Sequence, residues 1–313
     1  MALHADLFYA KTSSQILHIY QSIFVKHWRN LMASTTVGII GGSGLYKMEA
    51  MKIIKEHKME TPFGSPSSEI IEAQLGDSSF FFVPRHGKQH TISPSEINFR
   101  ANIYALKVLG VKTLISFSAV GSLKEELPPG TFVFPDQFID WTKGERERSF
   151  FGKGMVGHVS VAKPVENVLQ ERLAVAAKKL ALKFSRGGSY ICIEGPQFSS
   201  KGESLIYKNC FGASIIGMTN VPESYLAKEA GMAYATVAMV TDYDCWKEVH
   251  CTLEEIMKVM HSNTKTAHQL IQEIIPDLCK NPISFTPENG YAVMTPPELL
   301  SKDNKEILSV LLK

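Results

Sequence analysis

The sequence predicts an α/β fold in which a mixed, mainly parallel central sheet carries helices on both faces. From Thr36 onward, short apolar runs alternate with helical patterns, which is the order that strand–helix–strand units produce. The run at 233–240 contains small and β-branched residues without polar alternation, as expected for an interior strand that is covered on both faces. With 313 residues and 44% hydrophobic content, the chain can bury a sizeable core. We expect one domain over residues 32–313.

The elements of this fold are predicted from apolar runs, from helical periodicity and from turn residues. The expected strands lie at 37–40, 70–75, 80–83, 114–120, 132–139 with a bulge at Pro135, 190–193, 214–218 and 233–240. The expected helices lie at 97–109, 165–182, 222–230, 254–275 and 298–312. The second and third strands form a pair that turns at Gly76 and Asp77.

The first 31 residues differ from the rest of the chain. They contain Lys11, Lys26 and Arg29 against Asp6 alone, which accounts for the whole formal net charge of +2. We interpret residues 1–31 as an N-terminal extension upstream of a second methionine, Met32, with an organelle-targeting segment as the alternative. The neutral remainder gives no field that would favour nucleic acid.

The five cysteines show no CxxC or Cys/His zinc spacing. This pattern predicts free thiols in a reducing compartment and no metal site. No segment approaches 18 apolar residues, so we expect no membrane span. We expect a cytoplasmic protein, with the nucleus as a second location.

Two aspartates, Asp242 and Asp244, follow the apolar run at 233–240. Open α/β sheets bind ligands outside the carboxyl ends of their strands. If the extended geometry continues, positions i and i+2 point the same way, so both carboxylates can face one ligand. Burial and mutual repulsion would raise their pKa values. The alternative is that Asp242 caps the next helix and Asp244 is solvated.

Other strand ends carry groups that suit an anion. Ser43 lies in the glycine-rich turn at 41–44, Arg85 and His86 follow the strand at 80–83, and Ser118 and Thr219 close two further strands. Backbone N–H groups, hydroxyls and a planar guanidinium all match phosphate oxygens. Each feature alone fits a structural turn or a solvated basic loop, but together they indicate a phosphate site.

A segment that suits a flat ring follows the strand at 190–193. Phe198 can stack on a flat ring, and Ser199 can hydrogen-bond to the edge of that ring. A buried core phenylalanine is the alternative for Phe198.

These segments, in this order, resemble the methylthioadenosine phosphorylases of the trimeric purine nucleoside phosphorylase family. The resemblance covers about residues 36–313. The motifs that carry it are Gly38-Ile-Ile-Gly-Gly-Ser-Gly-Leu45, Thr61-Pro-Phe-Gly64, Arg85-His-Gly-Lys-Gln-His-Thr-Ile92, Pro129-Gly130, Asp136-Gln-Phe-Ile-Asp140, Ile193-Glu-Gly-Pro196, Phe198-Ser-Ser200, Met218-Thr219 and Thr241-Asp-Tyr-Asp-Cys-Trp246. Gln197 departs from the family's usual arginine, and the loop at 247–252 is shorter than in many relatives.

The resemblance implies a nucleoside phosphorylase-like fold and phosphorolysis of 5'-methylthioadenosine without metal or organic cofactor. It also implies a homotrimer with the active site at the subunit interface. The phosphate-binding residues implied are Ser43, Arg85, His86, Ser118, Ala119 and Thr219. The substrate-binding residues implied are Phe198, Ser199, Met218, Leu253 and Ile256, with His158 and Leu311 from a neighbouring subunit. Asp242 and Asp244 are implied as the purine-site carboxylates.

We hypothesise that Asp242 donates a proton to purine N7 while bound phosphate attacks C1' of the ribose. Asp244 would orient Asp242 or hold the exocyclic amino group. A proton donor at position 242 favours adenine over a 6-oxopurine. A 5'-methylthioinosine or broader purine nucleoside phosphorylase, a hydrolase that uses water, and a non-catalytic nucleoside-binding protein are the alternatives.

Overall fold

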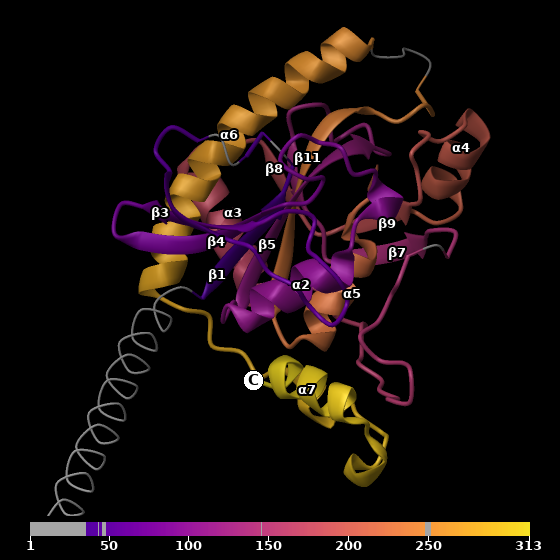
Figure 1. The fold of residues 1–313 in the computed structure, drawn as a ribbon. Coiled ribbons are helices and arrows are strands. Elements are labelled where there is room, and N and C mark those ends of the chain that lie inside the picture. The colour runs from indigo at the N-terminus through magenta and orange to yellow at the C-terminus, as the bar shows by residue number, and fades with distance from the viewer. Residues whose placement is uncertain (1–35, 43, 46–47, 145, 248–251) are drawn as a thin grey trace, which may run out of the picture.

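The fold is given by a computed structural model that describes residues 36–42, 44–45, 48–144, 146–247 and 252–313 (Figure 1). The expected extension at residues 1–31 lies outside the described residues. None of the helices in the described ranges combines the length and the apolar composition that crossing a membrane requires.

The described strands form one mixed sheet of eleven strands. They are β1 (Val37–Gly41), β2 (Lys52–His57), β3 (Ile70–Leu75), β4 (Ser78–Pro84), β5 (Thr113–Ser122), β6 (Phe132–Phe134), β7 (Gln137–Trp141), β8 (Phe184–Arg186), β9 (Ser189–Ile193), β10 (Ile215–Gly217) and β11 (Ala233–Tyr243). The main path runs β2-β3-β4-β1-β5-β10-β9-β7, while β11 pairs with β5 and β6, and β8 pairs with β6. Parallel pairings outnumber antiparallel ones, which confirms the predicted sheet type.

Helices cover both faces of this sheet (Figure 1). They are α2 (Phe99–Val108), α3 (Asn167–Lys179), α4 (Lys201–Asn209), α5 (Asn220–Glu229), α6 (Leu253–Lys280) and α7 (Lys302–Leu311). Short 3₁₀ turns lie at η1 (Pro94–Glu96), η2 (Glu288–Tyr291) and η3 (Pro297–Leu299). Helices α3 and α6 share one core cluster with the sheet, and α2, α5 and α7 share another on the opposite face.

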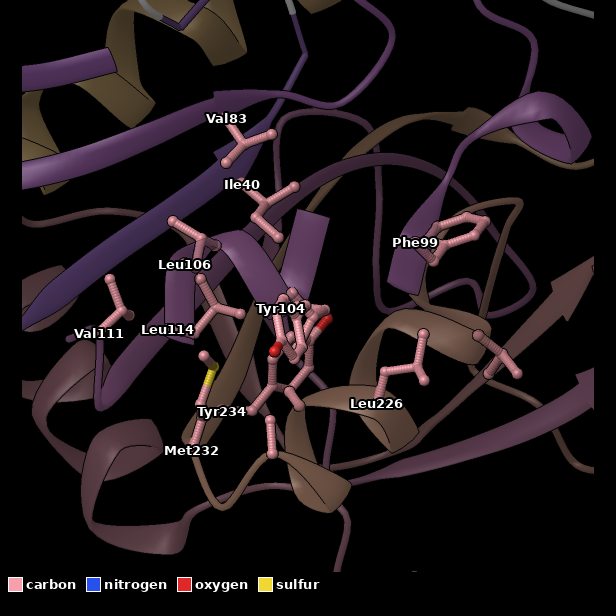
Figure 2. Packing of buried hydrophobic residues seen from close by; sticks show 14 of the residues in the cluster. Ile40, Val83, Phe99, Tyr104, Leu106, Val111, Leu114, Leu226, Met232 and Tyr234 are labelled. Atoms are coloured by element: carbon pink, nitrogen blue, oxygen red, sulfur yellow. The ribbon is translucent and has the colours of Figure 1, made fainter. Parts of the chain in front are cut away.

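The cluster under α2 and α5 packs against central strands of the sheet. Figure 2 shows Ile40 and Leu114 from the central strands facing Leu106 of α2, with Leu226 of α5 and Tyr234 of β11 close by. These side chains alternate with those of the second cluster along each strand, because successive residues of a strand point to opposite faces. The two clusters hold β5 and β11 rigidly between them.

The expected single strand at 132–139 is wrong. At Pro135 and Asp136 the chain leaves β6, which pairs with β11 and β8, and enters β7, which pairs with β9. Proline has no N–H to donate to a ladder, so pairing ends there rather than continuing past a bulge. Strands β2 and β8 and helix α4 were not predicted, because they are short or polar.

The break between β6 and β7 is stabilised by a buried side chain from α3. The Gln170 amide donates to the carbonyls of Phe134 (2.7 Å) and Pro135 (3.2 Å), and its oxygen accepts from Arg186 Nε (2.9 Å). We expect Gln170→Leu to lower the free energy of unfolding by about 1–3 kcal/mol, since it leaves buried carbonyls unpaired. Denaturant titration measures this change.

A matched control is Val175→Ala on the same helix, because Val175 is exposed. It should leave the free energy of unfolding within about 0.5 kcal/mol of the wild-type value. Equal losses in the two variants would contradict the role assigned to Gln170.

Candidate active site

The two aspartates lie at the carboxyl end of the longest parallel pairing in the sheet, β5 with β11. The register shifts between Val240 and Asp242, so that Asp242 pairs with Gly121. A Cβ at Gly121 would lie 3.5 Å from Asp244 Cβ and 3.6 Å from Asp242 Oδ2. Both aspartates therefore lie beside the same glycine, and they remain together in spite of the irregularity in the strand.

The surroundings of the two carboxyl groups favour their neutral forms. Burial raises the pKa of Asp242, and the Thr241 hydroxyl, which donates to Asp242 Oδ1 at 2.6 Å, partly opposes this rise. Burial also raises the pKa of Asp244, and the charge of Asp242 adds to the effect. Hydrogen bonding from the Ser204 hydroxyl, the Cys245 backbone and the Ser199 hydroxyl partly opposes this rise in pKa.

The alternative interpretation of the aspartate pair is wrong. Helix α6 is capped by Thr252, whose hydroxyl accepts from the backbone N–H of Glu255, so Asp242 is not its cap. Asp244 is only 8% exposed, so it is not solvated.

The raised pKa of Asp242 has a consequence for stability. The native state binds a proton on Asp242 more tightly than the unfolded chain does, so this residue makes the protein less stable as pH rises above the ordinary value of 3.8. We expect Asp242→Asn to have a higher Tm than the wild type at neutral pH, with the difference shrinking as pH falls toward 4. Thermal melts across this range measure it.

The control is Asp77→Asn, in the exposed turn between β3 and β4. It should show no gain that depends on pH in this way. A lower Tm for Asp242→Asn at every pH would mean that the Asp242 carboxylate stabilises the fold, contrary to this account.

Two hydroxyls of the expected phosphate site lie side by side, one on β5 and one just after β10. Strand β10 runs antiparallel to β5, with Ile216 opposite Gly121, and this direction carries Thr219 back toward Ser118. Ser118 Oγ lies 3.2 Å from Thr219 Oγ1, and both residues are 6% exposed. Ala119 beside them is exposed. The antiparallel direction of β10 differs from the parallel strand ends that the sequence suggested, but it brings the same groups together.

Arg85 lies at the expected strand end but is almost fully enclosed by protein, at 1% exposure. Its Nε and Nη2 donate to the two carboxylate oxygens of Glu223 at 2.7 and 3.0 Å. Its remaining bonds go to the Phe117 carbonyl (3.0 Å) and to Ser116 Oγ (2.6 Å). A guanidinium has five N–H donors, so one on Nη1 has no hydrogen-bond partner among the described residues. The alternative of a solvated basic loop is wrong for Arg85.

His86 is held as a neutral ring. Its Nδ1 lies 2.9 Å from the Ile92 carbonyl, and because a carbonyl only accepts, Nδ1 carries the proton. Burial, with the charge of Arg85, lowers the pKa of His86 to about 4. Nε2 is therefore an acceptor at neutral pH, a role that suits the O–H of a hydrogen phosphate ion.

A buried arginine that the sequence analysis missed fixes the turns around the site. Arg146 donates to the carbonyls of Met218 and Val221, each at 2.7 Å, and to Glu194 Oε1 at 2.7 Å. It thereby ties the turn after β10 to the turn after β9. Arg146 lies in a charged run that is typical of a solvated loop, so no signal in the sequence could have identified it.

The expected base-binding residues form an open platform on these turns. Phe198 is 81% exposed, which excludes the alternative of a core phenylalanine. The Ser199 carbonyl accepts from Cys245 Sγ at 3.1 Å, so the Phe198 turn is joined to the turn that carries Asp244. A Cβ at Gly195 would lie 2.5 Å from Met218 Sδ, which places the Met218 sulfur against the same platform.

The residues expected around the 5' group are not gathered in this way. Leu311 is 1% exposed in the core of its own chain. This contradicts the expectation that it reaches a neighbouring subunit, because its side chain has no free surface. His158 is exposed, and Ile256 is half-buried near the start of α6. Ser43 and the side chain of Leu253 lie outside the described residues.

The ion pair between Arg85 and Glu223 generates a prediction for stability. Glu223→Gln leaves a buried positive charge without its counter-ion, so we expect it to lower the free energy of unfolding by about 3–5 kcal/mol. The surface pair of Lys179 with Glu273 provides the control: Glu273→Gln should cost about 0–1 kcal/mol. Denaturant titration of both variants measures the two losses in free energy of unfolding. Similar losses would contradict the proposed importance of the buried pair.

Comparison with known proteins identifies the family. The model of the Phosphorylase superfamily matches residues 36–276, and the chain belongs to this family. The mixed, mainly parallel sheet with helices on both faces agrees with membership of the phosphorylases.

Several individual proteins of this superfamily are similar to the chain. The S-methyl-5'-thioadenosine phosphorylase of Hyperthermus butylicus is 50% identical over 79% of this chain and 89% of its own length. The enzyme of the same name from Synechocystis is 44% identical over 93% of this chain and 90% of its own length. A crystal structure of a methylthioadenosine phosphorylase from an Antarctic soil metagenomic library matches 89% of this chain and 99% of its own, with a TM-score of 0.85 and 41% identity. A Schistosoma mansoni methylthioadenosine phosphorylase in complex with adenine matches 78% of this chain and 92% of its own, with a TM-score of 0.74 and 37% identity.

Proposed function

We propose that this chain is a pentosyltransferase that converts 5'-methylthioadenosine and phosphate to adenine and 5-methylthioribose 1-phosphate. The reaction belongs to purine and methionine salvage. The observation that carries the proposal is that one region of the sheet holds both sets of groups: carboxyls with raised pKa values at the end of β11, and the Ser118 and Thr219 hydroxyl pair on its partner β5 and at the end of β10. The names of relatives at 42–51% identity support the substrate.

The chemistry follows from the position of these groups. A phosphate oxygen forms a bond to C1' of the ribose while the bond from C1' to N9 of the base breaks. The electron pair of that bond moves into the purine, and a proton from Asp242 neutralises it at N7. Acid assistance to the leaving group is the role that a carboxyl with a raised pKa can serve at neutral pH. Asp244 orients Asp242 or accepts from the exocyclic amino group.

Phosphate is held on the other side of the ribose by Ser118, Ala119 and Thr219, with the free N–H of Arg85 and with His86. The phosphate charge also stabilises the cationic sugar as it forms. In this proposal phosphate is a co-substrate, and no metal or organic cofactor takes part. Adenine is favoured because a protonated carboxyl can donate to N7 while a carboxyl oxygen accepts from the 6-amino group, which a 6-oxopurine lacks.

We also propose that the active protein is a homotrimer with its site at the subunit interface. Three exposed apolar side chains support this idea: Phe198 of the platform, and Met257 and Met260 near the start of α6. Apolar groups exposed at a site are typical of surfaces that a partner or ligand covers. Light scattering on the purified protein tests the oligomeric state.

The direct test of the reaction is release of free base from 5'-methylthioadenosine with and without phosphate. We expect release to require phosphate. Asp242→Asn should reduce turnover by about a hundred- to ten-thousand-fold, the usual contribution of a general acid, while a thermal melt shows that the fold is intact. The same release of free base is measured for Ser118→Ala with 5'-methylthioadenosine and for the wild type with adenosine.

Each of the other outcomes points to a different function. Release without phosphate would indicate a hydrolase, and no release from any nucleoside would indicate a binding protein. Faster release from 5'-methylthioinosine would show that Asp242 does not select the base. Full activity of Asp242→Asn would contradict its role as the acid.

A further inference from the structure

A buried tyrosine hydroxyl adjoins the hydroxyl pair of the phosphate site. Tyr190 of β9 is 0% exposed, and its Oη lies 3.3 Å from Ser118 Oγ. Ser118 Oγ in turn lies 3.2 Å from Thr219 Oγ1. Three hydroxyls thus form a continuous chain from the core to the site.

The fold makes room for this hydroxyl. A Cβ at Gly217 would lie 2.0 Å from Tyr190 Oη, so no residue larger than glycine fits at position 217 while the tyrosine keeps its place. The ring itself packs against Phe138, with centroids 5.8 Å apart, and belongs to the core cluster under α2 and α5. The ring of Tyr190 is therefore held by packing against Phe138, and its hydroxyl occupies the space that a side chain at position 217 would fill.

The 3.3 Å contact between Tyr190 Oη and Ser118 Oγ allows either oxygen to be the donor. The phenol has one proton to give, and Ser118 Oγ is the acceptor within reach. Burial keeps the phenol neutral, since it raises the pKa of Tyr190 far above the physiological range.

We infer that Tyr190 is a positioning residue for phosphate: its hydroxyl donates to Ser118 Oγ and leaves the Ser118 proton free to point at the anion. In the structure the Ser118 hydroxyl is placed to donate to the Ala119 carbonyl, 3.3 Å from its Oγ, so this carbonyl competes with the anion for the Ser118 proton. This inference rests on the proposed phosphorolysis, because it assigns Ser118 to phosphate. It concerns affinity for phosphate and does not concern the nucleoside.

The test is Tyr190→Phe, which keeps the ring and removes one oxygen. We expect KM for phosphate to rise roughly two- to tenfold, the equivalent of one net hydrogen bond. KM for 5'-methylthioadenosine and kcat at saturating phosphate should stay near the wild-type values. The rise in Tm that phosphate alone produces should also shrink, and this readout does not depend on turnover.

Tyr104→Phe is the matched control, because Tyr104 is also a buried tyrosine but lies on α2, where it packs against Phe63 and Phe150. It should change neither KM. A double-mutant cycle with Ser118→Ala adds a second measurement: if Tyr190 acts through Ser118, Tyr190→Phe should have no further effect on phosphate affinity in the Ser118→Ala background.

Several results would overturn the inference. They are an unchanged KM for phosphate in a folded Tyr190→Phe protein, an equal rise in both KM values, and full additivity with Ser118→Ala. Failure of the proposed function itself looks different, since the wild type would then show no dependence on phosphate at all.

Discussion

The ion pair between Arg85 and Glu223 is the constraint on which the rest of the site depends. It joins the end of β4 to α5, and through the Phe117 carbonyl and Ser116 it also holds β5. Tyr234 of β11 donates to the same glutamate at 3.0 Å. Burying two charges is costly unless their geometry and their remaining hydrogen bonds are well satisfied, and this network satisfies both conditions. The pair therefore fixes the relative positions of the four elements around it.

This fixed frame determines where the ligand groups lie. Asn220, the first residue of α5, has its Nδ2 within hydrogen-bond distance of the Ser116, Tyr234 and Thr236 hydroxyls, so the preceding residue, Thr219, is held against Ser118. Because Glu223 offsets the charge of Arg85, a phosphate ion at this place would be bound mainly by hydroxyls, backbone dipoles and one guanidinium N–H. Small changes in hydroxyl orientation then matter, which is why a tyrosine in the core can influence affinity.

Much of this arrangement could be predicted from the sequence, because strand ends in parallel sheets converge. The apolar run before Asp242, the hydroxyls at 118 and 219 and the aromatic Phe198 were all identified from position alone. The partners that hold them were not. Glu223 and Arg146 are charged residues in polar surroundings of the sequence, and only long-range packing shows that they are buried. The assignment of Leu311 to a neighbouring subunit came from the family resemblance, which does not show that this side chain is buried in its own chain.

The most direct measurement is a crystal structure of the protein with adenine and sulfate, in which sulfate takes the place of phosphate. The account predicts sulfate within hydrogen-bond distance of Ser118 and Thr219, and adenine on Phe198 with N7 facing Asp242. It also predicts that Arg85 keeps both bonds to Glu223 and adds a single bond to the anion. Sulfate bound elsewhere, or an Arg85 that leaves Glu223 to bind it, would contradict the account.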